Sequence, residues 1–218
     1  MSPPAIPIDI VSDVVCPWCF IGKRHLDAAL ARFEAPVSVR WLPYLLNPDT
    51  PPEGEPYRPF LERKFGGAEA LEGIWARVRE AGRHVGITFA FEKIALRANT
   101  LAAHRLIDRF QQQGNAGRSN ELVERLFHAG FCEGRFIGDP AILADIAASC
   151  GEDRQETVEW LHGEAAVEAV IAQEGRLRQL GISGVPFFIF NGRLAVSGAQ
   201  PPEVLLDALR QSIALSTD

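Results

Sequence analysis

The sequence predicts an α/β fold in which a long helical segment interrupts a sheet. A β-branched run at residues 6–11 predicts a buried strand, and residues 37–41 predict a second strand, with a helix between the two. A strand–helix–strand unit of this kind is right-handed and its two strands are parallel. Compact apolar runs at residues 187–190 and 194–196 predict that strands return only near the C-terminus. The sheet is therefore expected to form from both ends of the chain.

A tight hairpin is predicted to join the last two strands. Asn191 and Gly192 lie between them, and an Asn-Gly pair is the strongest short signal for a type I′ turn. Pro202 and Glu203 then begin a C-terminal helix, whose apolar face carries Leu205, Leu209 and Ile213. The chain should end as a hairpin followed by a helix.

The middle of the chain shows helical periodicity alone. Prolines crowd the segment from Pro43 to Pro59, which predicts a loop that leaves the sheet. Apolar residues then recur at helical spacing, for example at Leu71, Ile74, Trp75 and Val78. We expect a β-α-β part at residues 1–47, a helical insertion domain at residues 48–180, and a hairpin–helix part at residues 181–218. This order is typical of a thioredoxin-like fold with an inserted all-helical domain.

Composition excludes several classes of protein. The chain has 218 residues, of which 47% are apolar, and this is enough for a full core. Its formal net charge is −6 with both signs interspersed, which argues against a nucleic-acid surface. Apolar runs stay short of the roughly 18 residues that indicate a membrane span. Residues 1–7 lack the basic and long apolar regions of a secretory signal, so we expect a cytoplasmic protein without membrane or nucleic-acid partners.

The most informative motif is Cys16-Pro17-Trp18-Cys19, which follows the first predicted strand. Two cysteines at this spacing after a strand are typical of a redox-active pair. At a helix N-terminus, unpaired backbone N–H groups and the helix dipole favour a thiolate, which is the nucleophilic form. Pro17 suits the first helical position because its missing N–H is not needed there. Cys16, at the helix tip, should be the exposed attacking sulfur, and Cys19, which heads the apolar stripe, its buried partner.

Two other interpretations of the motif are a zinc half-site and a structural disulfide. The sequence contains no second Cys-x-x-Cys and no spaced histidine pair to complete four zinc ligands, so we expect no metal. The remaining cysteines, Cys132 and Cys150, are too few for a disulfide framework. Cys150 follows an apolar helical face and should be a buried small hydrophobe, whereas pairing of Cys132 with Cys150 stays open.

A second part of the site is predicted just before the third strand. Gly184-Val185-Pro186 leads directly into residues 187–190, and a proline at a strand start has positional meaning because it cannot donate to a ladder. In a thioredoxin-like frame, Pro186 resembles the cis-proline that packs beside the two cysteines. The resemblance implies that the Val185 backbone faces the active sulfur and binds an extended substrate. An ordinary trans proline in a loop is the alternative.

The chain resembles the DsbA-like superfamily of disulfide oxidoreductases, in particular its FrnE-like branch. The matching segments keep their order along the chain: Ser12-Asp13 with the cysteine motif, Leu46-Asn47-Pro48, Pro52-Glu53-Gly54, Asn99-Thr100 with Ala103-His104-Arg105-Leu106, Ile137-Gly138-Asp139-Pro140, and Gly184-Val185-Pro186-Phe187-Phe188. Isomerases of 2-hydroxychromene-2-carboxylate and kappa-class glutathione transferases share the implied fold, but they use a lone Ser or Cys to activate glutathione. Cys19 departs from that pattern and favours dithiol chemistry.

Four other side chains are candidates for the site. Trp18, between the cysteines, should tune the redox balance or contact substrate. By resemblance, Asn99 and His104 face the cleft and bind substrate, with helix capping and helix packing as their respective alternatives. Asp13 precedes Cys16 by three residues and should accept a proton or stabilise the loop, although a carboxylate raises the pKa of a nearby thiol.

These observations predict a thiol–disulfide oxidoreductase that exchanges a disulfide between Cys16 and Cys19 and a protein or small-molecule thiol. A glutathione-dependent isomerase or transferase that uses Cys16 alone is the main alternative, and a redox sensor or chaperone without turnover is a third. No cofactor is expected beyond the redox-active disulfide, with glutathione as an optional co-substrate. The physiological substrate, the direction of electron flow, the recycling partner and the oligomeric state stay open.

Overall fold

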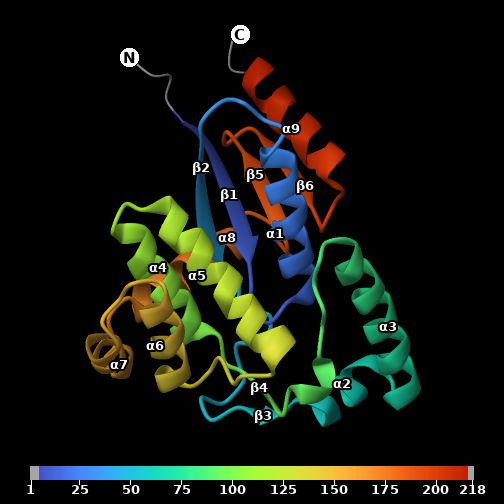
Figure 1. Ribbon diagram of the computed structural model, residues 1–218, viewed down its shortest axis with the longest axis vertical. Coiled ribbons are helices and arrows are strands. Elements are labelled where there is room, and N and C mark those ends of the chain that lie inside the picture. Colours follow the sequence, from blue (N-terminus) through green and yellow to red (C-terminus); the bar gives the residue numbers. More distant parts are fainter. Residues whose placement is uncertain (1–4, 216–218) are drawn as a thin grey trace.

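The computed structural model describes residues 5–215, which form a mixed four-stranded sheet and a set of surrounding helices (Figure 1). The strand order is β2-β1-β5-β6, with β1 at Ile6–Ser12, β2 at Val37–Pro43, β5 at Phe187–Phe190 and β6 at Leu194–Ser197. β1 runs parallel to β2 and antiparallel to β5. Segments from the two ends of the chain therefore meet in the centre of one sheet, as the sequence predicts.

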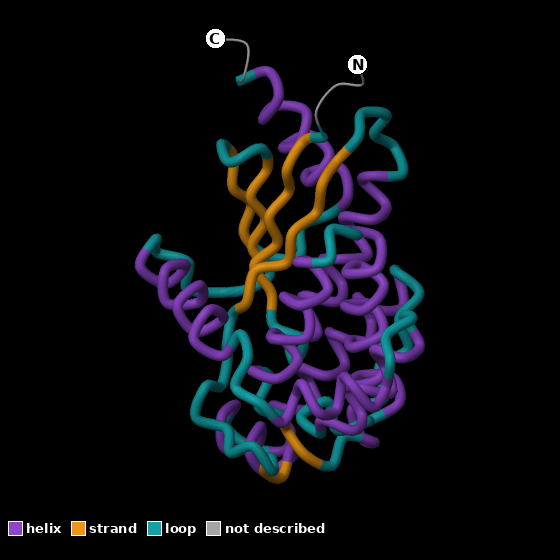
Figure 2. The backbone as a smooth tube through the Cα atoms, turned by 90° about the vertical axis from the view of Figure 1, so that its left-hand side faces the viewer, coloured by secondary structure: helices purple, strands orange, loops and turns teal. Residues whose placement is uncertain are grey.

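Helices cover the two faces of the sheet unequally. α1, Pro17–Leu30, and α9, Pro202–Ala214, pack against each other on one face. α8, Val167–Gln179, lies on the opposite face, where it contacts β2 and another helix, α4, Leu101–Gln112 (Figure 2). A small apolar cluster joins α8 to the sheet, formed by Val11, Leu42, Tyr44, Leu177 and Ile182. The main core therefore lies on the face that carries α1.

The other helices between β2 and β5 form two groups at one end of the sheet (Figure 1). One group contains α2, Tyr57–Phe65, and α3, Ala68–His84. The second group contains α4 at Leu101–Gln112, α5 at Ala116–His128, α6 at Pro140–Ser149 and α7 at Arg154–His162. Among residues 5–215, no helix is long and apolar enough to cross a membrane.

Short irregular elements connect the two helix groups. β3, Glu55–Pro56, pairs antiparallel with β4, Leu96–Arg97. A 3-10 turn at Phe91–Lys93 precedes β4, and a π-helical turn at Ala129–Glu133 follows α5. The sequence does not predict β3 and β4, because two residues are too few to show an alternating pattern. Their pairing draws the loop after β2 against the segment before α4.

One hydrophobic core runs from the sheet into both helix groups. Phe20 of α1 stacks on Phe127 of α5, with ring centroids 5.1 Å apart. Phe91 stacks on Phe89 at 5.1 Å and on Trp75 of α3 at 5.3 Å. Buried aromatic rings remove large apolar areas from water and gain further from ring contacts. Both helix groups therefore pack into the same core as Phe20 of α1, the helix that begins at the cysteine motif.

The predicted hairpin turn is confirmed by its backbone angles. Asn191 and Gly192 lie between β5 and β6 with φ values of 56° and 63°. A type I′ turn requires a positive φ at both central residues, and Asn and Gly adopt it most easily. The turn fixes the register in which Phe188 pairs with Val196.

Candidate active site

The N-terminus of α1 places the two cysteines of the motif. Cys16 is the N-cap residue, with extended backbone angles (φ −100°, ψ 111°), and Pro17 begins the helix. The Cys16 carbonyl accepts the first helical hydrogen bonds, from the N–H groups of Cys19 at 3.0 Å and Phe20 at 3.4 Å. The motif therefore lies at the positive end of the helix dipole, which favours negative charge.

The Cys16 sulfur is less exposed than the sequence predicts. Cys16 is 7% exposed and Cys19 is 1% exposed, so the expectation of an exposed Cys16 is wrong, whereas that of a buried Cys19 is confirmed. Side chains of α2 and α3 line the same cavity as Cys16. Cys16 is therefore approached through this cavity. Both sulfurs are free thiols in the structure.

The environment of Cys19 keeps its thiol protonated. Its pKa is raised well above the usual value, first because burial disfavours the thiolate, and then because Cys16 adds a hydrogen bond and a nearby charge. The Ser12 side chain and the Asp13 backbone oppose this increase. The Cys19 sulfur is thus held in its thiol form.

Pro186 lies against the first turns of α1. The Val185–Pro186 peptide bond is cis, as expected, and the Cys16 sulfur lies 3.8 Å from the Val185 carbonyl oxygen, which accepts from it. Gly22 permits this approach, because a Cβ atom there would lie 3.0 Å from Pro186 Cγ and 3.2 Å from the Phe188 ring. Residues 169 positions apart in the chain thus meet at one sulfur.

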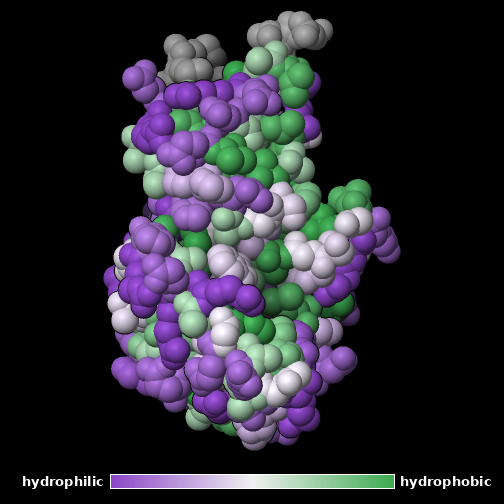
Figure 3. Space-filling view, turned by 90° about the vertical axis from the view of Figure 1, so that its right-hand side faces the viewer, coloured by the Kyte–Doolittle hydropathy of each residue, from purple (hydrophilic) through white to green (hydrophobic). Residues whose placement is uncertain are grey.

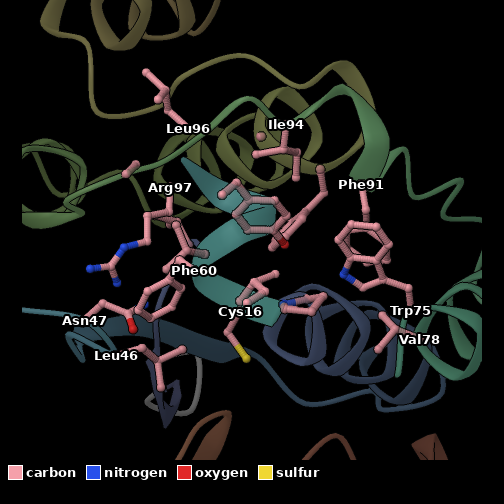
Figure 4. A pocket seen from close by; sticks show the side chains of 18 of the residues that line it. Cys16, Leu46, Asn47, Phe60, Trp75, Val78, Phe91, Ile94, Leu96 and Arg97 are labelled. Carbon is pink, nitrogen blue, oxygen red and sulfur yellow. The ribbon is translucent and has the colours of Figure 1, made fainter. Parts of the chain in front are cut away.

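A cavity of about 340 Å³ opens beside Cys16. In Figure 4, Asn47 and Arg97 lie on one side of Cys16, and Trp75, Val78 and Phe91 lie on the other. The walls are mostly apolar, and three half-exposed apolar side chains belong to the lining: Trp18, Leu46 and Phe65. Figure 3 shows hydrophobic side chains gathered around a hollow in the middle of one face, between the sheet end and the helical end of the molecule.

Tyr57 brings an unpaired hydroxyl to the cavity. It lines the cavity together with Cys16, and its ring stacks on Trp75 with centroids 6.3 Å apart. The hydroxyl makes no hydrogen bond with any other residue between 5 and 215. The pKa of Tyr57 is raised above its usual range, mainly by burial and further by the charge of Cys16. The hydroxyl is therefore neutral and available as a donor.

Two thiols at the start of a helix, a cis-proline beside them and a mixed sheet agree with one known family. Residues 7–210 match the DSBA-like thioredoxin domain. The chain belongs to this family. The match confirms the resemblance seen in the sequence, together with the thioredoxin-like fold and its helical insertion.

Relatives of this DsbA-like protein cover almost its whole length. The uncharacterised protein YwbO of Bacillus subtilis is 26% identical over 212 residues, which are 94% of this chain and 96% of YwbO. A probable DsbA oxidoreductase from Streptomyces coelicolor is 29% identical, with a TM-score of 0.86 over 96% of this chain and 90% of that one. The cytosolic disulfide reductase DsbM of Pseudomonas aeruginosa, solved with glutathione, is 16% identical, with a TM-score of 0.59 over 97% and 98%. This last likeness concerns the fold.

Asn99 lies one residue before Thr100, the N-cap of α4, and its side chain binds backbone groups on both sides of it. Its side-chain amide donates to the Thr50 carbonyl at 2.7 Å, and its oxygen accepts from the Leu101 N–H at 3.0 Å. It thereby ties the loop after β2 to the start of α4. Asn99 is not among the described residues that line the cavity, because both ends of its amide are engaged with backbone.

His104 is buried behind the motif and, like Asn99, lies outside the described cavity lining. Its Nε2 atom lies 3.5 Å from Asp13 Oδ1 and has no hydrogen-bond partner within the described chain. Asp13 is fully buried, and its second oxygen accepts from the Leu46 N–H at 2.8 Å. Asp13 thus stabilises the loop that carries Leu46, which is one of the two roles expected for it.

The cavity residues of α2 are the main part of the site that sequence reasoning missed. Tyr57, Phe60, Leu61, Lys64 and Phe65 recur at helical spacing, and all of them line the cavity. α2 contains no fully buried residue within the described chain, because its apolar face lines the cavity. An apolar stripe on a short helix just after a proline-rich loop is the signal that would have indicated this wall.

The other two cysteines lie apart from the site. Cys132 and Cys150 are free thiols, so the structure contains no bond between them. Burial raises the pKa of both, and nearby glutamates add to the effect. Cys150 is buried, as predicted. In the described residues, no three His, Cys, Asp or Glu side chains are placed to hold a metal ion.

Proposed function

We propose that this protein is a thiol–disulfide oxidoreductase in which Cys16 and Cys19 exchange a disulfide with a thiol substrate. One observation carries the proposal: a cavity-lining sulfur at a helix N-terminus lies beside a buried partner whose pKa is raised. Membership of the DSBA-like thioredoxin domain family supports it. Pro186, Pro17 and Trp18 are assigned supporting roles at the same sulfur.

The exchange proceeds in two steps. The Cys16 thiolate attacks one sulfur of a substrate disulfide, the substrate S–S bond breaks, and one substrate thiolate leaves. Cys19 then loses its proton and attacks the Cys16 sulfur, which releases the second substrate half. The departing thiolate takes up the proton from Cys19. The substrate disulfide gains two electrons, and the Cys16–Cys19 pair becomes a disulfide.

The two sulfurs are suited to different steps. A thiolate reacts as a nucleophile and a thiol does not, so a buried, protonated Cys19 does not compete for substrate. It reacts once the mixed disulfide has removed the negative charge from Cys16, because that charge contributes to its raised pKa. The Val185 carbonyl, 3.8 Å from the Cys16 sulfur, lies beside the position that the substrate disulfide takes in this proposal.

Single-cysteine variants test the proposal. Reduced protein is mixed with glutathione disulfide, and products are identified by intact mass. We expect Cys16→Ser to be inert, Cys19→Ser to stop at a mixed disulfide, and Cys132→Ser, the control, to react like the parent. Reaction of Cys16→Ser at the parent rate would refute the assignment.

A glutathione-dependent isomerase or transferase is the second candidate, because the cavity beside Cys16 is large and apolar enough for a small organic molecule. In that mechanism Cys16 acts alone and Cys19 is dispensable. Cys19→Ser therefore separates the two: isomerase or transferase turnover survives in the variant, while disulfide turnover stops.

We further propose a reducing direction in a cytoplasmic setting, with glutathione as a co-substrate. A structural neighbour that is described as a cytosolic disulfide reductase and was solved with glutathione supports this direction, although it shares only 16% identity. A reduction potential of the Cys16–Cys19 pair near or below that of glutathione is expected. A much more oxidising potential would favour disulfide formation instead.

A further inference from the structure

The cavity beside Cys16 has the chemistry of a small apolar binding site. Its volume of about 340 Å³ lies within the range of pockets that enclose small organic ligands. The walls away from the sulfur are aliphatic and aromatic, and they include Leu71, Ile74, Trp75, Val78, Phe91 and Ile94. An apolar group gains roughly 25 cal/mol for each Å² that it removes from water in such a space.

The charged side chains at the cavity are mostly engaged with other parts of the protein. Arg97 forms an ion pair with Glu55, and its guanidinium lies 3.6 Å from the Phe60 ring centroid. Arg135 lies 3.3 Å from Asp145. Lys64 lies over the ring of Phe60 at 5.6 Å, but neither its ammonium group nor the Asn47 side-chain amide has a hydrogen-bond or ion-pair partner within residues 5–215. The cavity therefore offers a polar ligand few free partners beyond Lys64, Asn47 and the Tyr57 hydroxyl.

This shortage of partners discriminates between two kinds of substrate. Each residue of a peptide brings one backbone donor and one acceptor, and burying either group without a partner is unfavourable. An aryl or branched alkyl group brings none. A compact apolar substituent therefore fits the cavity, whereas an extended peptide does not.

We infer that the cavity is a subsite for the apolar substituent of a low-molecular-weight disulfide, with an aryl or branched alkyl group next to the sulfur that Cys16 attacks. The inference rests on the proposed oxidoreductase function and adds the class of substrate. Tyr57 supplies a free hydroxyl to the cavity that Cys16 also lines. The remaining half of the disulfide extends past Trp18 toward solvent.

The reaction with an aryl disulfide balances within the protein. The Cys16 thiolate forms a bond to one aryl sulfur, the aryl S–S bond breaks, and one arenethiolate leaves. Cys19 attacks Cys16 and releases the second aryl group as a thiolate. The proton from Cys19 passes to one of the two products. The reduced protein supplies both electrons, so a single turnover needs no other reductant.

The test compares diphenyl disulfide with glutathione disulfide in single turnovers of the fully reduced protein. Each second-order rate is divided by the rate of the same disulfide with dithiothreitol, which removes intrinsic differences in leaving group. We expect the normalised rate for diphenyl disulfide to exceed that for glutathione disulfide at least about 10-fold.

Filling the cavity tests the same inference from the side of the protein. Ile94→Trp and, from α3, Ile74→Trp place a large ring into the space, since both residues are half-buried lining residues. We expect each to lower the ratio of the two normalised rates about 10-fold. Ile171→Trp, on an exposed part of α8, is the control and should leave the ratio unchanged. Thermal unfolding verifies that each variant is folded.

The outcomes separate the two proposals. If neither disulfide oxidises the reduced protein, the oxidoreductase function itself is wrong. If both react at equal normalised rates and the filled variants keep the parent ratio, the function stands and the apolar subsite is wrong. A disulfide-linked extended peptide that reacts faster than diphenyl disulfide would likewise overturn the choice of substrate class.

Discussion

The sheet part and the helical segment of this protein contribute to one site in different ways. The sheet part supplies the sulfurs, with Cys16 as the N-cap of α1, Cys19 in its first turn, and Pro186 directly before β5. The helical segment supplies the walls, from side chains dispersed over α2, α3 and the segment around β4. Chemistry is thus encoded in short contiguous motifs, and the shape of the binding space in packing between distant segments.

The tightest junction in the sheet part should be the most sensitive to added volume. A Cβ atom at Gly22 would lie 3.0 Å from Pro186 and 3.2 Å from Phe188. We expect Gly22→Val to lower the free energy of unfolding by about 3 kcal/mol and to slow disulfide exchange. Gly73→Val is the matched control in α3, where a Cβ would meet nothing within 4 Å, and it should change stability by less than about 1 kcal/mol. Urea denaturation measures both, and equal losses would contradict the packing argument.

The buried thiol predicts a pH dependence that belongs to the sheet part. The pKa of Cys19 is raised above its ordinary value of 9.0, so above about pH 9 the folded protein keeps a proton that the unfolded chain has lost. The free energy of unfolding of the reduced protein should therefore fall with rising pH, by up to about 1.4 kcal/mol per pH unit. Below pH 9 this contribution is constant.

Cys19→Ala should remove most of this alkaline slope. Cys132→Ala is the control, because burial raises the pKa of that thiol also, but less strongly. Urea denaturation at a series of pH values between 7 and 11 measures the slopes. If the free energy of unfolding of Cys19→Ala keeps the same slope with pH, burial does not keep the Cys19 thiol protonated.

Asn99 should act on stability and not on substrate choice. Asn99→Ala removes the hydrogen bonds to the Thr50 carbonyl and from the Leu101 N–H. We expect a loss of about 1–2 kcal/mol in the free energy of unfolding, with the ratio of normalised rates for the two disulfides unchanged. A changed ratio of the normalised rates would instead indicate that Asn99 contributes to substrate binding, and it would contradict a purely structural role for this residue.

Tyr57 should show the smallest effect on stability. Its hydroxyl has no partner within the described chain, so Tyr57→Phe should alter the free energy of unfolding by less than about 0.5 kcal/mol. If the hydroxyl donates to the reacting sulfurs, the rate of exchange should fall about 2- to 10-fold. Stopped-flow measurement of the first mixed-disulfide step tests this, and an unchanged rate would leave Tyr57 as a wall residue only.

The elements that the sequence predicts well are those whose signals are local. The cysteine motif, the Asn191-Gly192 turn and the proline before β5 each depend on two to four adjacent residues and a fixed backbone geometry. The strands of the sheet appear as apolar runs for the same reason. Each of these features is confirmed, with boundaries that differ by one or two residues.

The features that the sequence does not reveal depend on contacts between distant segments. Cys16 is buried and shares a cavity with side chains of α2 and α3, and helical periodicity does not predict where those helices pack. Asn99 and His104 were expected in the cleft by resemblance, yet Asn99 is held by backbone groups of Thr50 and Leu101. The cavity itself is a space left between elements, so no residue pattern encodes it directly.

The strand order has a consequence for the newly made chain. β1 is the strand between β2 and β5, and Val185, which meets the Cys16 sulfur, is 169 residues further along. At about 5–20 residues per second, the ribosome needs roughly ten to thirty seconds to make this stretch. Throughout that interval one edge of β1 has no partner strand and both thiols of the motif lack their final cover. The nascent chain therefore exposes the thiols of Cys16 and Cys19 early. They are fully covered only when the C-terminal segment that contains Val185 and β5 has emerged.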